Sequence, residues 1–162
     1  MSDDAITGLA QQVLERCRAR NLMLATAESC TGGMIAAALT EIAGSSDVVE
    51  RGFVTYSNEA KTELLGVPAE TIRAHGAVSE PVARAMAEGA LAHSPASVAI
   101  SCTGIAGPGG GTRDKPIGLV HFAAARKRQT TLHEECRFGD IGRDKVRMKS
   151  VEAALKLLLQ IF

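Results

Sequence analysis

The stretch LATAESCTGG, residues 24–33, carries two side chains that could act as a nucleophile. Ser29 and Cys30 follow a short apolar run and precede two glycines, which is also the pattern of a tight turn between a strand and a helix. A thiol is intrinsically the better nucleophile, but the motif holds no histidine that could convert Cys30 to a thiolate. Ser29 is therefore the preferred candidate, and a turn without catalytic function is the alternative.

A second stretch, VTYSNEAK at 54–61, supplies a possible general base. Lys61 has an ordinary pKa near ~10.4, so it is almost fully protonated at neutral pH. It could accept a proton from a serine only in a dry pocket that lowers this pKa by several units. Tyr56 could share or relay the proton, and Asn58 or Ser57 could cap the helix that begins here. The alternative is a lysine on a solvated helix face.

Histidine is the commoner partner of a catalytic serine. No histidine of this chain lies in a glycine-rich loop, and only His75, in RAHGAVS, is kept as an open candidate. The other three fall within or at the ends of predicted elements: His93, His121 and His133.

Two glycine-bearing loops each follow an apolar strand, so both could lie where the carboxyl ends of parallel strands bind ligands. In the first loop the N–H groups of Thr31, Gly32 and Gly33 open a helix and could bind an oxyanion or a phosphate. The alternative is a glycine turn in which Thr31 is an ordinary N-cap. The second loop, CTGIAGPGGG at 102–111, lacks both the Walker A pattern and the dinucleotide fingerprint. Any phosphate there would be held by backbone amides.

Arg143 and Arg147 are the basic residues best placed to meet an anion. They are four positions apart at the start of the last predicted helix and therefore share a face. Guanidinium groups bind phosphate in bidentate fashion. The alternative is that they are surface charges beside Asp140 and Asp144.

Composition excludes several classes of protein. The chain has 162 residues with 18 basic and 18 acidic side chains and few aromatic residues, which disfavours nucleic-acid binding. The basic run RKRQ at 126–129 is best explained as a solvated turn. No apolar run approaches the ~20 residues of a membrane span, and the acidic start is unlike a signal peptide, so we expect a soluble, cytoplasmic protein. The four cysteines form no CxxC pair, so a zinc site, a thioredoxin-like site and a disulfide framework all lack support.

Hydrophobic periodicity then predicts the elements that must position these residues. Helices are expected at 3–19, 32–43, 58–66, 67–76, 79–93 and 143–160. Strands are expected at 21–26, 47–57, 96–104, 117–125 and 130–138, the last two joined as an antiparallel hairpin. The long 104–116 loop between strands is of the kind that usually has a function. The chain is thus expected to be a single α/β domain, residues 1–162, with a mixed, mostly parallel sheet and helices on both faces.

Five motifs in order, spanning residues 24–147, resemble the CinA C-terminal domain family. They are ATAESCTGG, VTYSNEAKTELLGV, HGAVSE, GIAGPGGG with KPIGLV, and FGD followed by the two arginines. The resemblance implies a three-layer α/β/α sandwich that self-associates, most simply as a dimer. It also implies hydrolysis of the carboxamide of nicotinamide mononucleotide to nicotinate mononucleotide and ammonia, in pyridine-nucleotide recycling, with no cofactor or metal.

The resemblance further implies roles for individual residues. The family's serine, tyrosine and lysine map onto Ser29, Tyr56 and Lys61. The residues mapped to the phosphate and ribose side are Thr103, Gly104, Gly107, Gly109 and Arg143. In the family pattern an arginine directly follows the aspartate of the late motif, whereas GDIGR inserts two residues here.

Two other functions fit the same residues. The domain could be a non-catalytic nucleotide-binding or protein-interaction module linked to competence or DNA damage. It could also be an amidase for another small pyridine or purine amide. Ammonia release from nicotinamide mononucleotide separates all three.

Overall fold

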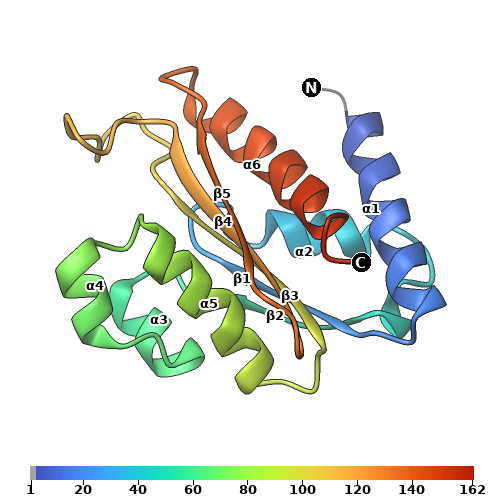
Figure 1. The fold of residues 1–162 in the computed structure, drawn as a ribbon. Helices are drawn as coiled ribbons and strands as arrows, with labels where there is room; N and C mark the ends of the chain where they lie inside the picture. Colours follow the sequence, from blue (N-terminus) through green and yellow to red (C-terminus); the bar gives the residue numbers. More distant parts are fainter. Residues whose placement is uncertain (1–2) are drawn as a thin grey trace.

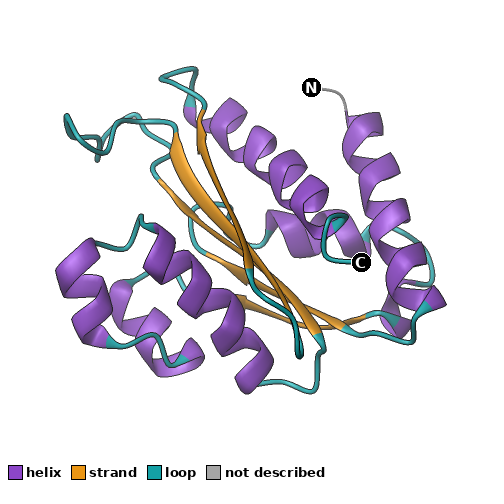
Figure 2. Cartoon of the chain, in the orientation of Figure 1, coloured by secondary structure: helices purple, strands orange, loops and turns teal. Residues whose placement is uncertain are grey.

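The computed structural model describes residues 3–162 as a five-stranded sheet between two layers of helices (Figures 1 and 2). The strands are β1 (Leu24–Glu28), β2 (Val49–Val54), β3 (Val98–Gly104), β4 (Leu119–Arg126) and β5 (Leu132–Arg137). One face is covered by α1 (Asp3–Ala19), α2 (Met34–Thr40) and α6 (Arg143–Leu158). The other face is covered by α3 (Asn58–Leu65), α4 (Ala69–His75) and α5 (Glu80–Ala92). A short 3-10 turn spans Ser45–Asp47. Within residues 3–162, no helix combines the length and apolar character that crossing a membrane requires.

The strand order is β2-β1-β3-β4-β5. The pairings of β1 with β2 and with β3 are parallel, whereas β4 pairs antiparallel with both β3 and β5. Every strand except β4 therefore points in one direction. The predictions of a mixed, mostly parallel sheet and of a late hairpin are confirmed.

Residues of each strand alternate between the two faces of the sheet. The side chains on one face are larger than those on the other. Leu24, Ile100 and Phe122 pack under the first helical layer. The opposite face of the sheet is built from small residues: Ala25, Ala27, Ala99, Ala123 and Ala125. This small face lets α5 lie close to the sheet. Gly89 extends the close packing, because a Cβ there would stand 2.0 Å from the carbonyl oxygen of Leu65. The end of α3 is thereby fixed against α5.

The structure corrects two predicted boundaries around the first glycine loop. β1 continues to Glu28 instead of ending at 26, and α2 begins at Met34 instead of 32. The cause is one buried carboxylate: Glu28 accepts hydrogen bonds from the N–H groups of Ile35 and Ala36 at 2.9 and 3.0 Å. These bonds tie the end of the strand to the first turn of the helix. The five residues between them, 29–33, form a tight turn.

Candidate active site

A cavity of about 270 Å³ opens where β1, β2 and β3 end. It is lined by most of the residues proposed from sequence: Ser29, Tyr56, Asn58, Lys61, Thr103, Gly104, Gly107, Gly109 and Arg143. Cys30, Ala77 and Val78 also line it, as do three further residues of the glycine-rich loop. Thr31, Gly32, Gly33 and Arg147 lie outside the lining. Because β1, β2 and β3 are parallel neighbours, segments far apart in the sequence converge at their carboxyl ends.

Ser29 and Lys61 are in direct contact. Lys61 Nζ lies 3.0 Å from Ser29 Oγ and 2.9 Å from the carbonyl oxygen of Thr55. The lysine is only 1% exposed, although its residue type is normally at the surface. Its place is set by α3, which begins where the Ser57 hydroxyl accepts the N–H of Ala60. Ser57 is therefore the helix cap, and Asn58 is the first residue of α3 and faces the cavity.

Burial lowers the pKa of Lys61. Among residues 4–162, no carboxylate lies within ion-pair distance of its Nζ atom, so the charged form has no counter-ion there to compensate for the loss of water. A neutral amine donates two hydrogen bonds and accepts one. It can therefore donate to the carbonyl of Thr55 and accept the hydroxyl hydrogen of Ser29. The geometry suits a lysine that takes the serine proton.

Cys30 makes no hydrogen bond with Lys61 within the described residues. Its Sγ atom lies 3.7 Å from that of Cys102, within the core beneath α2 and α6. No base contacts Cys30 in the described part of the chain. Of the two possible nucleophiles, only Ser29 meets a base.

Glu28 is the residue that sequence reasoning missed. Its side chain is completely buried, and besides the two helix N–H groups it accepts the hydroxyl of Thr31 at 2.5 Å. Thr31 is thus bound to Glu28 and is not the N-cap of α2, which is Gly33 in a left-handed conformation (φ 106°). The signal was present as an acidic residue at the end of an apolar run, immediately before the candidate nucleophile. Glu28 fixes the tight turn that holds Ser29.

Arg147 holds the same turn from the other side. Its Nε donates to the carbonyl of Cys30 at 3.1 Å, and its Nη2 donates to that of Thr31 at 3.4 Å. Gly32 is also engaged, because its N–H donates to the carbonyl of Ser29 at 3.0 Å. The proposed anion-binding amides of this loop are therefore partly occupied. Arg147 binds turn carbonyls here, in place of the anion expected from sequence.

Arg143 does reach the cavity. Its two terminal nitrogens donate to the carbonyl of Gly107 and to the hydroxyl of Tyr56, both at 2.8 Å. The two extra residues of GDIGR are accommodated before α6, which begins at Arg143. The phenol of Tyr56 is 59% exposed and turns to Arg143, while its backbone carbonyl lies 3.4 Å from Lys61 Nζ. A proton relay through the phenol stays a prediction.

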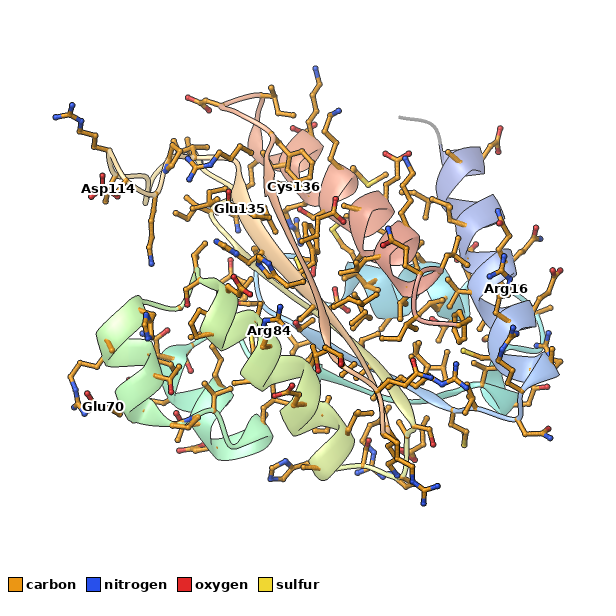
Figure 3. All side chains as sticks on the ribbon, viewed as in Figure 1. Arg16, Glu70, Arg84, Asp114, Glu135 and Cys136 are labelled. Atoms are coloured by element: carbon orange, nitrogen blue, oxygen red, sulfur yellow. The ribbon has the colours of Figure 1, made fainter. Side chains whose placement is uncertain are left out.

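The loop between β3 and β4, residues 105–118, offers free donors. Within residues 3–162, four N–H groups of this loop have no hydrogen-bond partner although their residues line the cavity: Ala106, Gly107, Gly109 and Gly110. Asp114 lies at the outer end of the same loop, projecting away from the sheet (Figure 3). Thr103 lines the cavity, and its hydroxyl donates to the carbonyl of Ala77 at 2.9 Å. Successive free N–H groups of this kind suit an anion.

The histidines lie apart from the cavity. His75 is exposed at the end of α4, and only its neighbours Ala77 and Val78 reach the lining. His121 and His133 contact each other across β4 and β5, with 2.9 Å between Nδ1 and Nε2. In the described part of the chain, no three or more His, Cys, Asp or Glu side chains are grouped so that they could hold a metal ion.

Comparison with known proteins gives the family. Residues 6–162 match the model of the CinA C-terminal domain. The chain belongs to the CinA C-terminal domain family. This CinA domain is 50% identical to nicotinamide-nucleotide amidohydrolase PncC of Escherichia coli strain K12, over 100% of this chain and 98% of that protein. It is 49% identical to a CinA-like protein of Syntrophobacter fumaroxidans, over 94% of this chain but only 36% of that longer protein.

Solved structures of relatives share the fold. The crystal structure of competence/damage inducible protein CihA from Agrobacterium tumefaciens has a TM-score of 0.95 with this CinA domain at 52% identity, covering 99% of this chain and 96% of that one. A CinA superfamily protein from Escherichia coli has a TM-score of 0.93 at 37% identity, covering 100% and 94%. The predicted α/β/α family fold is confirmed.

Proposed function

We propose that this CinA domain hydrolyses the carboxamide of nicotinamide mononucleotide, releasing ammonia and nicotinate mononucleotide. The similarity to PncC over the full chain supports the activity. The observation that carries the mechanism is the buried contact of 3.0 Å between Lys61 Nζ and Ser29 Oγ at the cavity wall.

In the first step, Ser29 Oγ attacks the carboxamide carbon while neutral Lys61 takes the hydroxyl proton. The lysine is prepared for this by burial, which keeps its pKa below the ordinary value. The carbonyl of Thr55 orients the amine by accepting one of its N–H groups. The product of this step is a tetrahedral adduct whose former carbonyl oxygen carries the negative charge.

The N–H of Cys30 is the donor best placed for that oxyanion. Its residue lines the cavity, and it directly follows Ser29. The sequence suggested that amides of the TGG run bind the oxyanion. In this proposal the amide of Cys30 takes that role. The N–H of Gly32 is used inside the turn, and Glu28 occupies those of Ile35 and Ala36. The amide of Cys30 is the one next to the nucleophile.

Collapse of the adduct breaks the carbon–nitrogen bond. Protonated Lys61 returns its proton to the leaving nitrogen, which departs as ammonia and leaves an ester on Ser29. Water then attacks the ester, again losing a proton to Lys61, and nicotinate mononucleotide is released with the serine restored. Each proton taken by the lysine is given back within the cycle.

The phosphate end of the substrate fits the opposite wall of the cavity. The free N–H groups of the 105–118 loop and the Arg143 guanidinium lie there, and both are suited to an anion. Arg143 is held by Gly107 and Tyr56, so its position is set before substrate binds. This arrangement supports a phosphorylated substrate.

The test is ammonia release from nicotinamide mononucleotide by purified protein. We expect activity in the wild type and in Cys30→Ala, and a loss of at least about 10⁴-fold in Ser29→Ala. Nicotinamide riboside, which lacks the phosphate, should be hydrolysed with a much higher KM. An active Ser29→Ala together with an inactive Cys30→Ala would transfer the nucleophile to the thiol. Binding of the mononucleotide without ammonia release would favour the non-catalytic module.

A further inference from the structure

Two thiols, Cys30 and Cys102, meet directly behind the nucleophile. Both are free, Cys102 is fully buried, and Cys30 is 6% exposed. The register of β1 and β3 brings them together, because Glu28 is paired with Cys102 and the N–H of Ser29 donates to the carbonyl of Cys102 at 3.0 Å. The sulfur atoms lie 3.7 Å apart, so a disulfide of ~2.05 Å requires them to approach by roughly 1.7 Å.

Only one of the two cysteines lines the cavity. Cys30 lines it beside Ser29, whereas Cys102 does not. The hydrogen bond from Cys102 lowers the pKa of the Cys30 thiol, and burial raises the pKa of Cys102. A small oxidant that enters the cavity therefore meets Cys30 first, with Cys102 in contact on the inner side. This is the order of a reacting thiol and a resolving thiol.

We propose that Cys30 and Cys102 are a site of reversible thiol oxidation whose oxidant is a small hydroperoxide such as hydrogen peroxide. The Cys30 sulfur attacks one peroxide oxygen, the O–O bond breaks, and Cys30 becomes a sulfenic acid as water leaves. The Cys102 sulfur then attacks the Cys30 sulfur, the S–O bond breaks, and the departing hydroxide leaves as water with the Cys102 proton. Two thiols are oxidised to one disulfide while one peroxide is reduced to two waters, and a thiol reductant reverses the change.

The disulfide displaces the nucleophile. Cys102 lies within β3, which is hydrogen-bonded to β1 on one side and β4 on the other, so it cannot move far. Cys30 lies in the irregular turn after β1, so Cys30 makes most of the approach and carries the adjoining Ser29 with it. A displacement of about 1 Å at a reacting atom costs on the order of a hundredfold in rate. This inhibition rests on the proposed amidase function, whereas formation of the disulfide does not.

The experiment treats the full chain with a stoichiometric amount of hydrogen peroxide and follows intact mass, peptide map and ammonia release together. We expect the wild type to lose two hydrogens in mass and to yield a Cys30–Cys102 cross-linked peptide. Ammonia release should fall on the order of a hundredfold, and dithiothreitol should restore both mass and activity.

Two variants serve as controls. Cys136→Ser removes a partly exposed thiol on β5 (Figure 3) and should behave as the wild type. Cys102→Ala should keep its basal activity and form no cross-link. Its Cys30 should instead gain one oxygen as a sulfenic acid, which dithiothreitol also reduces.

Three outcomes have separate meanings. Recovery of both cysteine peptides fully alkylated after peroxide treatment overturns the site, and this result needs no variant to fold. A complete cross-link with unchanged ammonia release overturns the inhibition. A cross-link in a protein that released no ammonia before oxidation leaves the thiol site standing and counts against the proposed function alone.

Discussion

The two glycine-bearing loops at the cavity are built in opposite ways. In the nucleophile turn, residues 29–33, the backbone is held by Glu28 inside and by Arg147 outside. In the glycine loop, residues 105–118, several N–H groups that face the cavity have no partner in the described chain. Similar sequence composition therefore serves two purposes. The turn is bonded internally and fixes the reacting serine, whereas the loop keeps its donors free for a ligand.

Electrostatics separate the two regions as well. The turn directly follows a buried carboxylate that accepts hydrogen bonds from three donors, and the neighbouring lysine is buried without an acid. The loop side presents an exposed arginine. Near the nucleophile, the carboxylate of Glu28 is held by hydrogen bonds and burial favours the neutral form of Lys61. On the loop side, Arg143 keeps a positive charge that can bind an anion. The predictions below test this division, beginning with the largest effect.

Lys61→Met should abolish activity and stabilise the fold. Removal of the base should lower ammonia release by about 10⁴-fold, as for other parts of a nucleophile–base unit. A methionine fills similar space without a buried amine, so the midpoint of thermal unfolding at neutral pH should rise. Lys127→Met, in the exposed β4–β5 turn, is the matched control and should change neither property. A variant that lost activity together with stability would show that the lysine is chiefly structural.

Activity and stability should both increase with pH, for the same reason. The folded pKa of Lys61 is lowered by burial, so below it kcat should fall about tenfold for each pH unit. Between the folded pKa and the ordinary lysine pKa, the unfolded chain binds a proton that the folded chain does not, so the free energy of unfolding rises with pH. Comparison of wild type and Lys61→Met by denaturant unfolding should show this slope only in the wild type. A kcat that does not fall as the pH is lowered through the folded pKa of Lys61 would count against a tuned lysine.

Glu28→Gln tests the inner support of the turn. The amide keeps the size of the side chain but can place an NH₂ group against an N–H of α2, which leaves a buried donor unsatisfied. We expect a loss of about 1–3 kcal/mol in unfolding free energy and a fall of kcat on the order of tenfold or more, with KM little changed. Glu41→Gln, exposed at the other end of α2, is the control. Unchanged kcat in a destabilised Glu28→Gln would limit the role of Glu28 to stability.

The sequence predicted the elements of the fold and the pair of Ser29 and Lys61, but it did not predict the contacts that hold the nucleophile turn. Periodicity located every strand and the hairpin, and the family motifs placed Ser29 and Lys61 in one site. It did not find Glu28, because acidic residues are normally exposed and its three donors, two N–H groups of α2 and the Thr31 hydroxyl, come together only in the folded turn. It assigned Arg147 to an anion because the turn carbonyls to which Arg147 donates come near it only in the folded chain. The contact between Cys30 and Cys102 depends on the β1–β3 register, which no local pattern encodes.

Two glycine substitutions give the smallest but most direct comparison. Gly33, in the turn, has φ 106°, so an alanine there is strained by about 1–3 kcal/mol even though its Cβ would stand an acceptable 3.6 Å from Val54. Gly109, in the loop, lies outside the left-handed region and its Cβ would meet open space, so Gly109→Ala should change stability by less than about 0.5 kcal/mol. Thermal unfolding and ammonia kinetics of the two variants measure the contrast. A large rise in KM for a stable Gly109→Ala would mean that the mononucleotide occupies that open space, which would place the substrate directly on the glycine loop.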